Sequence, residues 1–395
     1  MTYEELKRSV IDAVSGPDLE RETVINACHR LSLRLSSGEY LPLLKQAGLD
    51  EKAAEEKMRQ AAVFLDRDTL TYRVEREIGW LKERRTAPLG VIFHIGASNM
   101  EGLAAYSAVE GLLTGNVNLV KLPGEDEGIN TFLLKELIEL EPRLRPLIHV
   151  FRIPSSDRRR MRLLMDLSDG ICVWGGLEAV KGVRQMAKAN EKLIEWGHKL
   201  SFAYVTKRGM TEENLRGIAE NIVSTGQMLC SSVQGIYLDS ESIKEAEAFC
   251  RLFWKILEEE AGKYRPDETG SRAYYTLKAY EQELEDAASG KKNWRGNGIS
   301  VSLDPDPSLK LAGGFGNCWV KLLPREKIIE TLKWEKSLQQ TVALACGQEE
   351  AKELSRLLIR AGAVRIKNVK ELKKAECWEP HDGEYPLLRY LRILD

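Results

Sequence analysis

The sequence predicts an α/β protein built on a doubly wound parallel sheet, and three observations carry this prediction. Short, uniformly apolar runs alternate with helical runs from Pro88 onward. Strands covered on both faces have this continuous apolar character, which is typical of parallel sheets. Small-residue loops follow two of these runs, at the strand ends where ligands bind in such folds. The 395 residues are enough for two domains.

The expected elements follow in order along the chain. Residues 1 to about 85 predict helices with polar connectors, of which residues 50–65 are clearly amphipathic. Later strands are expected at 89–95, 117–122, 147–153, 170–174, 200–206, 235–238, 299–303 and 318–322. Later helices are expected at 101–113, 129–140, 158–167, 177–189, 212–223, 242–263, 276–288, 336–345 and 349–361. Residues 195–199 and 290–298 read as loops.

The composition excludes several classes of function. With 43% hydrophobic and 30% charged residues and a net charge of −2, the chain has no broad attraction to nucleic acid or anionic membranes. The seven cysteines are scattered and lack C-x-x-C spacing, so neither a disulfide framework nor a metal site is expected. No apolar run is long enough to span a membrane, and the first residues do not resemble a signal peptide. We therefore expect a cytoplasmic protein.

Cys230 is the strongest candidate for a functional residue. It lies among small and polar residues, between a helical run at 212–223 and a strand-like run at 235–238. Short polar neighbours with free backbone N–H groups lower the pKa of a thiol, and a thiolate is a strong nucleophile. A structural cysteine is more often buried among apolar residues. The segment predicts a thiol presented to a cleft, with catalysis and a structural role both open at this point.

Three further candidates lie at predicted strand ends. The amide of Asn99 could donate to a developing oxyanion, although asparagine also favours helix N-caps. Lys121 ends the second strand and could bind a cofactor hydroxyl or phosphate, or simply be solvated. Gly175 and Gly176 begin a helix, where backbone N–H groups bind phosphate, but a plain tight turn is the alternative. The three-glycine dinucleotide motif is absent.

Two polar pairs complete the set of candidates. Glu195 and His198 lie about 35 residues before Cys230, and either could be a general base or a solvated side chain. His381 and Asp382 form a second pair near the end of the chain, where turn formation alone is the alternative.

Taken in order, these segments resemble the aldehyde dehydrogenase superfamily over about residues 88–238. Asn99 falls at the position of the family's oxyanion-hole asparagine, and Lys121 at that of the lysine that holds the adenosine ribose. Trp174-Gly175-Gly176 resembles the turn that meets the pyrophosphate, and Glu195 falls at the general-base glutamate of E-x-G-G-K. The run from Gly226 to Cys230 resembles the catalytic cysteine motif.

Where the sequence departs from that pattern, it resembles the LuxC-type acyl-CoA reductases. Met228 and Leu229 separate Gln227 from Cys230, where the usual motif has one residue. The other similar segments are Cys230–Gln234, Ser337–Thr341 and Trp378–Gly383 with Arg392. His198 stands where E-x-G-G-K has its second glycine, and we find no E-x-F segment of the kind that holds the nicotinamide ribose.

The resemblance implies an aldehyde dehydrogenase-like fold with a Rossmann-like cofactor domain and an α/β catalytic domain. We expect the N-terminal helices and the dinucleotide-binding domain at 1–199, the thiol domain at 200–370, and a tail at 371–395 packing back on the cofactor or oligomerisation region. The implied reaction reduces a long-chain acyl-CoA or acyl-protein thioester to the aldehyde through an acyl-cysteine.

The resemblance also implies NADPH, although the carboxylates of residues 125–127 would suit NADH. The expected partners are an acyl-protein synthetase and further copies of the chain in a homodimer or homotetramer, with no nucleic acid and no integral membrane segment. A short-chain acylating aldehyde dehydrogenase and a non-catalytic subunit are the alternatives.

Overall fold

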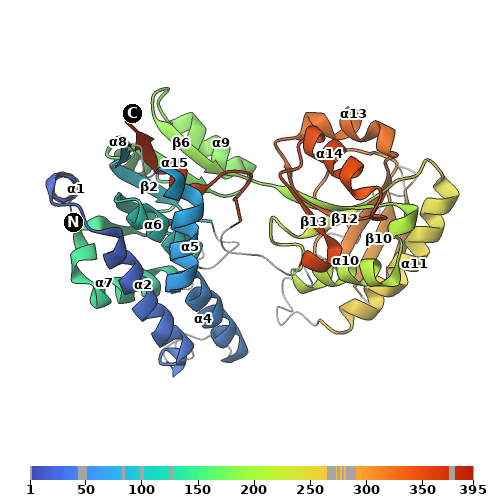
Figure 1. Ribbon diagram of the computed structural model, residues 1–395, viewed down its shortest axis with the longest axis horizontal. Coiled ribbons are helices and arrows are strands. Elements are labelled where there is room, and N and C mark those ends of the chain that lie inside the picture. Colours follow the sequence, from blue (N-terminus) through green and yellow to red (C-terminus); the bar gives the residue numbers. More distant parts are fainter. Residues whose placement is uncertain are drawn as a thin grey trace. The chain divides into compact units, whose positions relative to one another are not determined.

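The computed structural model describes residues 2–42, 51–81, 85–97, 102–124, 128–264, 273, 276, 277, 280, 281, 291–296, 298–372 and 379–394. The chain divides into two compact units (Figure 1). Unit 1 contains Met1–Gly197 and Glu376–Asp395, and unit 2 contains His198–Ala375. Unit 2 is therefore inserted into the sequence of unit 1, because residues 376–395 return to unit 1.

Unit 1 is built on a parallel five-stranded sheet with the strand order β4-β3-β2-β5-β6. The strands are β2 (Val91–Ile95), β3 (Val117–Lys121), β4 (Ile148–Phe151), β5 (Gly170–Trp174) and β6 (Lys192–Trp196). Alternate side chains of a strand point to opposite faces. Residues such as Phe93 and Val173 pack with α1, α8 and α9, whereas Ile92 and Cys172 face the other way. This arrangement confirms the doubly wound sheet predicted from the apolar runs.

Helices cover both faces of this sheet. The described helices of unit 1 before its last segment are α1 (Tyr3–Ser15), α2 (Arg21–Ser36), α4 (Glu51–Leu65), α5 (Arg67–Ile78), η1 (Gly79–Leu81), α6 (Leu103–Leu113), α7 (Ile129–Leu140), η2 (Pro142–Leu147), α8 (Arg158–Asp166) and α9 (Leu177–Met186). One apolar core joins α2, α4, α6 and α7, so the predicted N-terminal helices are confirmed and pack onto the sheet unit. A second core lies under α1, α8 and α9.

The carboxyl-terminal segment returns to unit 1 and completes one of its layers. It forms α15 (Pro386–Arg389) and β14 (Leu391–Ile393), which pairs antiparallel with β1 (Thr86–Pro88). Tyr390 is fully buried and packs with Ile92, Cys172, Ile194 and Trp196. The segment thus covers β5 and β6 on the face opposite α9, and Figure 1 draws it beside β6.

Unit 2 is built on a seven-stranded sheet with the order β13-β12-β7-β8-β11-β10-β9. Its strands are β7 (Leu200–Val205), β8 (Val233–Leu238), β9 (Lys292–Gly296), β10 (Ile299–Leu303), β11 (Asn317–Leu322), β12 (Gln339–Ala345) and β13 (Arg365–Asn368). All pairs are parallel except the pairing of β9 with β10 at the edge.

Two layers of helices cover the sheet of unit 2. Its described helices are η3 (Lys207–Gly209), α10 (Glu212–Ser224), α11 (Ile243–Ala261), η4 (Arg325–Lys327), α13 (Ile328–Leu332), η5 (Lys333–Glu335), α14 (Ala351–Ala361) and η6 (Val369–Glu371). The helices α10 and α11 pack in one core, and α13 and α14 pack in another.

The structure corrects three sequence predictions. Residues 336–345 were expected to be helical, but 339–345 form β12, a strand whose residues are all buried. The expected loop 290–298 contains the edge strand β9, and the expected loop 195–199 begins inside β6. Most of the helix predicted at 276–288 lies outside the described residues.

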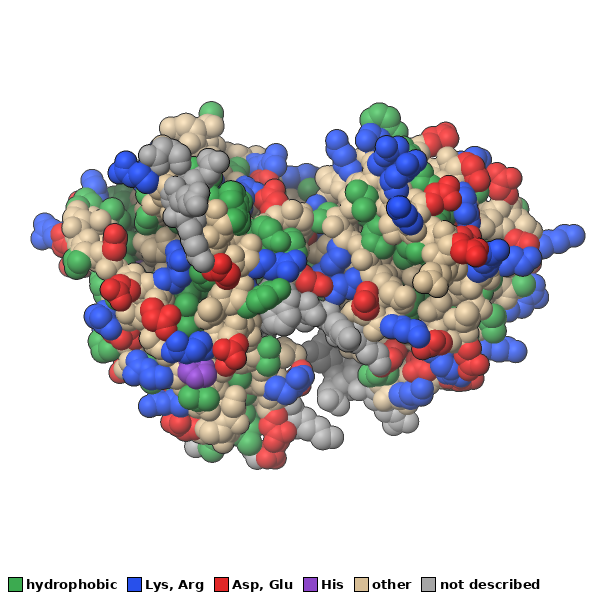
Figure 2. Space-filling view, in the orientation of Figure 1, with side chains coloured by type: hydrophobic (Ala, Val, Ile, Leu, Met, Phe, Trp, Pro, Cys, Tyr) green, Lys and Arg blue, Asp and Glu red, His purple; other side chains and the backbone are tan. Residues whose placement is uncertain are grey.

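The surface carries no dominant charge on the face drawn in Figure 2. Basic and acidic side chains are interspersed over both units there. Among the described helices, none is both long enough and apolar enough to cross a membrane.

Candidate functional site

Cys230 lies in the turn between α10 and β8 of unit 2, where it is half-buried and free of any disulfide. Its backbone carbonyl accepts a 2.7 Å hydrogen bond from the hydroxyl of Ser201 on β7. The same hydroxyl accepts a 3.1 Å bond from the backbone N–H of Thr341 on β12. The pairing of β7 with β8 is irregular between Ser201 and Ala203, which is typical of strands beside functional sites. The sheet therefore fixes the backbone at the thiol.

Two glutamines hold the rest of the thiol loop, residues 225–234. The side-chain amide of Gln227 donates to the carbonyls of Val233 and Gln234 at 3.2 and 3.3 Å. Its oxygen accepts from the backbone N–H of Gly316 at 3.1 Å. Gln234 in turn donates to the Gln227 carbonyl at 3.1 Å and accepts from the N–H of Ala312 at 3.2 Å. Both glutamines are buried, so these bonds tie the thiol loop firmly to the loop at 312–316.

The contact between these loops contains strained backbone. Gln227 and Phe315 have φ angles of 62° and 47°, in the left-handed region that non-glycine residues rarely adopt. The N–H of Phe315 donates to the Gly226 carbonyl at 3.1 Å, and a Cβ added at Gly226 would lie 3.3 Å from the Phe315 ring. Such conformations persist where the surroundings enforce them, and they cluster at active sites. The strain is an independent sign of function at the thiol loop.

Burial separates Cys230 from the other described cysteines. Desolvation raises the pKa of Cys172 to about 11 and those of Cys28 and Cys250 to about 12, and it raises that of Cys318 still further. Cys346 is half-buried, and desolvation followed by the charge of Glu350 raises its pKa as well. These thiols stay protonated near neutral pH, which leaves Cys230 as the candidate nucleophile among the described cysteines.

Lys121 ends β3 in unit 1 as an almost completely buried cation, 3% exposed. Its ammonium donates to the hydroxyl of Ser155 at 3.0 Å, and among the described residues no carboxylate pairs with it. Desolvation lowers its pKa. A buried ammonium that lacks an anion is costly, so the site suits the hydroxyl or phosphate groups of a dinucleotide.

Gly175 and Gly176 form the turn between β5 and α9. The N–H of Gly175 donates to the Trp196 carbonyl at 3.2 Å, so it is engaged within the protein. Gly176 is the N-cap of α9 without a side-chain cap, and a Cβ added there would meet nothing within 4 Å. This helix N-terminus therefore has room for a phosphate group.

Glu195 lies on β6, with its side chain toward α9. Both carboxylate oxygens accept hydrogen bonds of 2.5 Å from Arg184 in a bidentate ion pair. His198 is the first residue of unit 2, and desolvation lowers its pKa. Asn99 lies outside the described residues. Thus Lys121, Gly175, Gly176 and Glu195 belong to unit 1, and Cys230 to unit 2.

The structure adds residues that sequence reasoning missed. Ser201 and Ser155 support predicted site residues or their neighbours, but their partners lie between 29 and 140 residues away in the sequence. The loop at 312–316 carried a usable signal, because Gly313, Gly314 and Gly316 surround one aromatic residue. Such a run predicts backbone that passes close to another segment.

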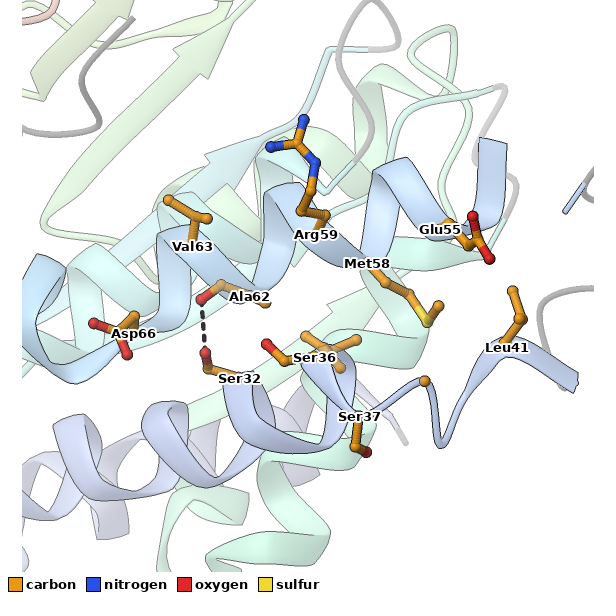
Figure 3. Close-up of a pocket in the computed structure, with 12 residues that line it drawn as sticks. Ser32, Ser36, Ser37, Leu41, Glu55, Met58, Arg59, Ala62, Val63 and Asp66 are labelled. Atoms are coloured by element: carbon orange, nitrogen blue, oxygen red, sulfur yellow. Dashed lines mark hydrogen bonds between the residues drawn. The ribbon is translucent and has the colours of Figure 1, made fainter. Parts of the chain in front are cut away.

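One hollow in unit 1 lies apart from these residues. It has a volume of about 550 Å³ and lies between α2 and α4, where the Ser32 hydroxyl donates to the Ala62 carbonyl at 2.7 Å (Figure 3). Met58 and Leu41 line it together with Glu55, Arg59 and Asp66. None of the predicted site residues lines this hollow.

Comparison with known proteins gives one family for nearly the whole chain. A model of the family described as Acyl-CoA reductase (LuxC) matches residues 18–393. The long-chain acyl-protein thioester reductase 2 of Photobacterium leiognathi is 25% identical over 323 residues, covering 78% of this chain and 64% of that protein. The long-chain acyl-protein thioester reductase of Vibrio harveyi is 22% identical over 404 residues, covering 95% of this chain and 83% of its own length.

Solved structures establish the fold. An NAD-dependent aldehyde dehydrogenase from Sinorhizobium meliloti superposes with a TM-score of 0.74 at 13% identity, covering 99% of this chain and 86% of that chain. Lactaldehyde dehydrogenase from Escherichia coli superposes with a TM-score of 0.69 at 16% identity, covering 98% and 88%. The aldehyde dehydrogenase-like fold expected from the motifs is confirmed.

Proposed function

Because this chain belongs to the acyl-CoA reductase (LuxC) family, we propose that it reduces a long-chain acyl thioester to the fatty aldehyde through an acyl group carried on Cys230. The observation that carries the proposal is the thiol loop. It holds a half-buried cysteine by bonds from two strands and a second loop, and it does so at the cost of strained backbone. A cysteine with only a packing role needs none of this.

The first step transfers the acyl group to the protein. The Cys230 thiolate attacks the carbonyl carbon of the thioester, a new C–S bond forms, and the thiolate of coenzyme A or of a carrier protein leaves. The amide of Asn99 and the backbone N–H of Cys230 would donate to the oxyanion of the tetrahedral intermediate. The Ser201 bond fixes the peptide of Cys230, so the loop needs no reorganisation during the attack.

The second step needs one hydride, which carries two electrons and one proton, and one further proton to release the acyl group as aldehyde and restore the thiol. A bound nicotinamide cofactor supplies the electrons as a hydride. Lys121 and the open backbone of Gly176 are the residues that would hold its ribose and pyrophosphate. We place NADPH before NADH on the family resemblance. Values of kcat/KM measured with both cofactors decide between them.

The ion pair of Glu195 favours reduction over hydrolysis. Arg184 donates to both carboxylate oxygens and holds the Glu195 side chain toward α9, which supports a role other than the activation of water. Water activated beside an acyl-cysteine would hydrolyse the thioester and waste it. We propose that Glu195 acts on the hydroxyl proton of the thiohemiacetal, after release from Arg184, and on water only in a side reaction.

The substrate proposal follows the named relatives. Both are called long-chain acyl-protein thioester reductases, which supports a long-chain acyl-protein thioester as the substrate, with acyl-CoA as its soluble substitute. An acyl-protein synthetase as the source of the acyl group is proposed on the family resemblance alone.

The test is an intact-mass measurement of the full chain incubated with myristoyl-CoA in the absence of cofactor. The wild type should gain the mass of one myristoyl group, and addition of NADPH should remove it and release aldehyde. Cys346→Ala is the matched control, because this half-buried thiol lies elsewhere in unit 2 and its loss should leave the adduct intact. If Cys230→Ala carries the same adduct as the wild type, the assignment of the nucleophile is wrong.

A further inference from the structure

The turn at His381 brings three aromatic rings together in unit 1. The ring of His381 lies 4.9 Å from that of Trp174 and 5.1 Å from that of Trp196, measured between centroids. The two tryptophan rings lie 5.5 Å apart, so each ring contacts the other two. Trp174 and Trp196 are the last residues of β5 and β6. A residue from the end of the chain therefore packs on the strand ends that precede Gly175 and Gly197.

The backbone of this turn is rigid. Asp382 and Gly383 have consecutive positive φ angles of 50° and 83°, as in the tight type I′ turn that an Asp-Gly pair favours. The N–H of Glu384 donates to the His381 carbonyl at 2.9 Å and closes the turn. The turn thus fixes the backbone from which the His381 side chain projects.

The same segment also holds Trp174 from its other side. The indole N–H of Trp174 donates to the Ser107 hydroxyl at 3.0 Å. The Ser107 hydroxyl lies 3.2 Å from the phenol oxygen of Tyr390, which in turn lies 3.2 Å from the sulfur of Cys172. Tyr390 is fully buried. The Trp174 ring therefore contacts His381, and its N–H donates to Ser107, whose hydroxyl contacts Tyr390; His381 and Tyr390 both come from the carboxyl-terminal segment.

We propose that His381 is a positioning residue for the cofactor turn, residues 174–176. Its ring keeps Trp174 and Trp196 in place, and thereby sets the backbone at Gly175 and Gly176 that would meet a cofactor pyrophosphate. Gly175 transmits the effect, because its N–H donates to the carbonyl of Trp196 at 3.2 Å. The proposal rests on the proposed function for the identity of the ligand. It gives the His-Asp-Gly run near the end of the chain a role in binding a nicotinamide dinucleotide.

The main test measures NADPH binding by the change in its own fluorescence, with three variants of the full chain. His381→Ala should raise the dissociation constant roughly three- to tenfold, as expected for loss of an aromatic contact. His381→Phe keeps a ring at this position and should restore most of the affinity. His29→Ala is the matched control, because His29 belongs to the same unit and its side chain is 30% exposed, against 32% for His381. Its affinity should equal that of the wild type.

Two further readouts separate positioning from general damage. Acylation of Cys230 by myristoyl-CoA needs no cofactor, so its rate should be unchanged in His381→Ala while KM for NADPH rises. In the ligand-free protein, hydrogen exchange at residues 175–179 should be faster in His381→Ala than in the wild type. Unchanged NADPH affinity and unchanged exchange in that variant overturn the inference. A His381→Phe variant as weak as His381→Ala overturns it too, because ring packing would then not be the cause. If the wild type binds no nicotinamide dinucleotide, the proposed function itself fails.

Discussion

The hydroxyl of Ser201 donates a 2.7 Å hydrogen bond to the backbone carbonyl of Cys230. It also accepts from the buried N–H of Thr341, so one side chain joins β7, β12 and the thiol loop. Nothing in the sequence marks Ser201, which is one serine among several in strand-like runs. Because of this position, a substitution of Ser201 tests the proposed mechanism without changing Cys230 itself.

Ser201→Ala leaves a carbonyl and a buried N–H without their partner, which should lower the free energy of unfolding by about 1–3 kcal/mol. The acylation rate of Cys230 should also fall, roughly tenfold, because the peptide that presents the thiol becomes mobile. Urea unfolding and the rate of adduct formation by mass spectrometry measure the two effects. Ser231→Ala is the control, since no described residue forms a hydrogen bond with that hydroxyl. Equal acylation rates in both variants would refute the role of Ser201.

Met228 and Leu229 should determine preference for chain length. Their side chains are 45% and 41% exposed beside Cys230, although both are apolar. Covering them with an acyl chain would contribute about 1 kcal/mol each, so the double change Met228→Ser with Leu229→Ser should lower kcat/KM for myristoyl-CoA roughly tenfold or more. The value for butyryl-CoA should stay near that of the wild type. Leu252→Ser, at 48% exposed on α11, is the control. An equal loss with both substrates would contradict this prediction and favour a short-chain enzyme.

Lys121→Met should have opposite effects on stability and on cofactor binding. The ammonium is buried with only the Ser155 hydroxyl as a described partner, so its removal relieves a desolvation cost. The ligand-free variant should unfold at the same or a higher urea concentration than the wild type. Its dissociation constant for NADPH should rise roughly tenfold or more, since a charged hydrogen bond contributes about 1.5–3 kcal/mol. Lys135→Met, at an exposed position on α7, should change neither quantity. A destabilised variant with normal affinity would mean that Lys121 is purely structural.

Glu110 should make the folded protein less stable as the pH rises toward 7. Desolvation, opposed by Arg73 and assisted by the charge of Glu77, raises the Glu110 pKa to about 7. The Arg73 guanidinium pairs with both carboxylates, at 2.7 Å to Glu110 and 3.0 Å to Glu77. The second carboxylate oxygen of Glu110 is buried without a hydrogen-bond partner among the described residues. The folded protein therefore binds more protons than the unfolded chain between pH 4.5 and 7. This contribution to stability is complete below pH 4.5 and is lost as the pH rises through 7.

Glu110→Gln mimics the protonated carboxyl and should remove this loss. The free energy of unfolding of the variant, minus that of the wild type, should increase by about 2–3 kcal/mol between pH 5 and 8 in urea titrations. The difference in unfolding free energy between variant and wild type is the proper measure, because His94 changes the stability of both proteins with pH in the opposite direction. Burial lowers the His94 pKa to about 4, and its contribution grows as the pH rises from 4 to 6.5. A difference that is constant with pH would show that Glu110 is already ionised in the folded protein.

The parallel sheets were predictable because most of their strands are apolar throughout, and β12 shows where this signal fails. That strand begins with Gln339 and Gln340, which are almost completely buried. The amide of Gln339 donates to the carbonyls of Leu332 and Ala361 at 2.8 and 2.9 Å. Buried polar residues of this kind are invisible to a reading of hydrophobic runs, so the segment read as a helix. The edge strand β9 was missed because its residues are polar and it pairs on one side only.

The candidate site was predictable only where a residue follows directly from its own segment. Such candidates could be proposed from sequence because Lys121 ends β3, Gly176 caps the start of α9, and Cys230 lies in the turn between the recognisable α10 and β8. Ser201 contacts Cys230 because of the register of neighbouring strands. His381 contacts Trp174 although the whole sequence of unit 2 lies between them. Contacts of this kind depend on how distant segments pair, and a single sequence carries no local record of that pairing.

The insertion of unit 2 into unit 1 has a consequence for biosynthesis. A ribosome makes His198–Ala375 as one uninterrupted stretch, whereas unit 1 stays incomplete until residues 376–395 have emerged. Domains generally fold as units during synthesis, so unit 2, which carries Cys230, can mature on the nascent chain before unit 1 has its Tyr390 and its His381. Under the proposed function, Cys230 would then exist for a time without the unit proposed to hold its electron source. Translation that stops just short of the end would yield a protein able to take up acyl groups but poorly able to release them.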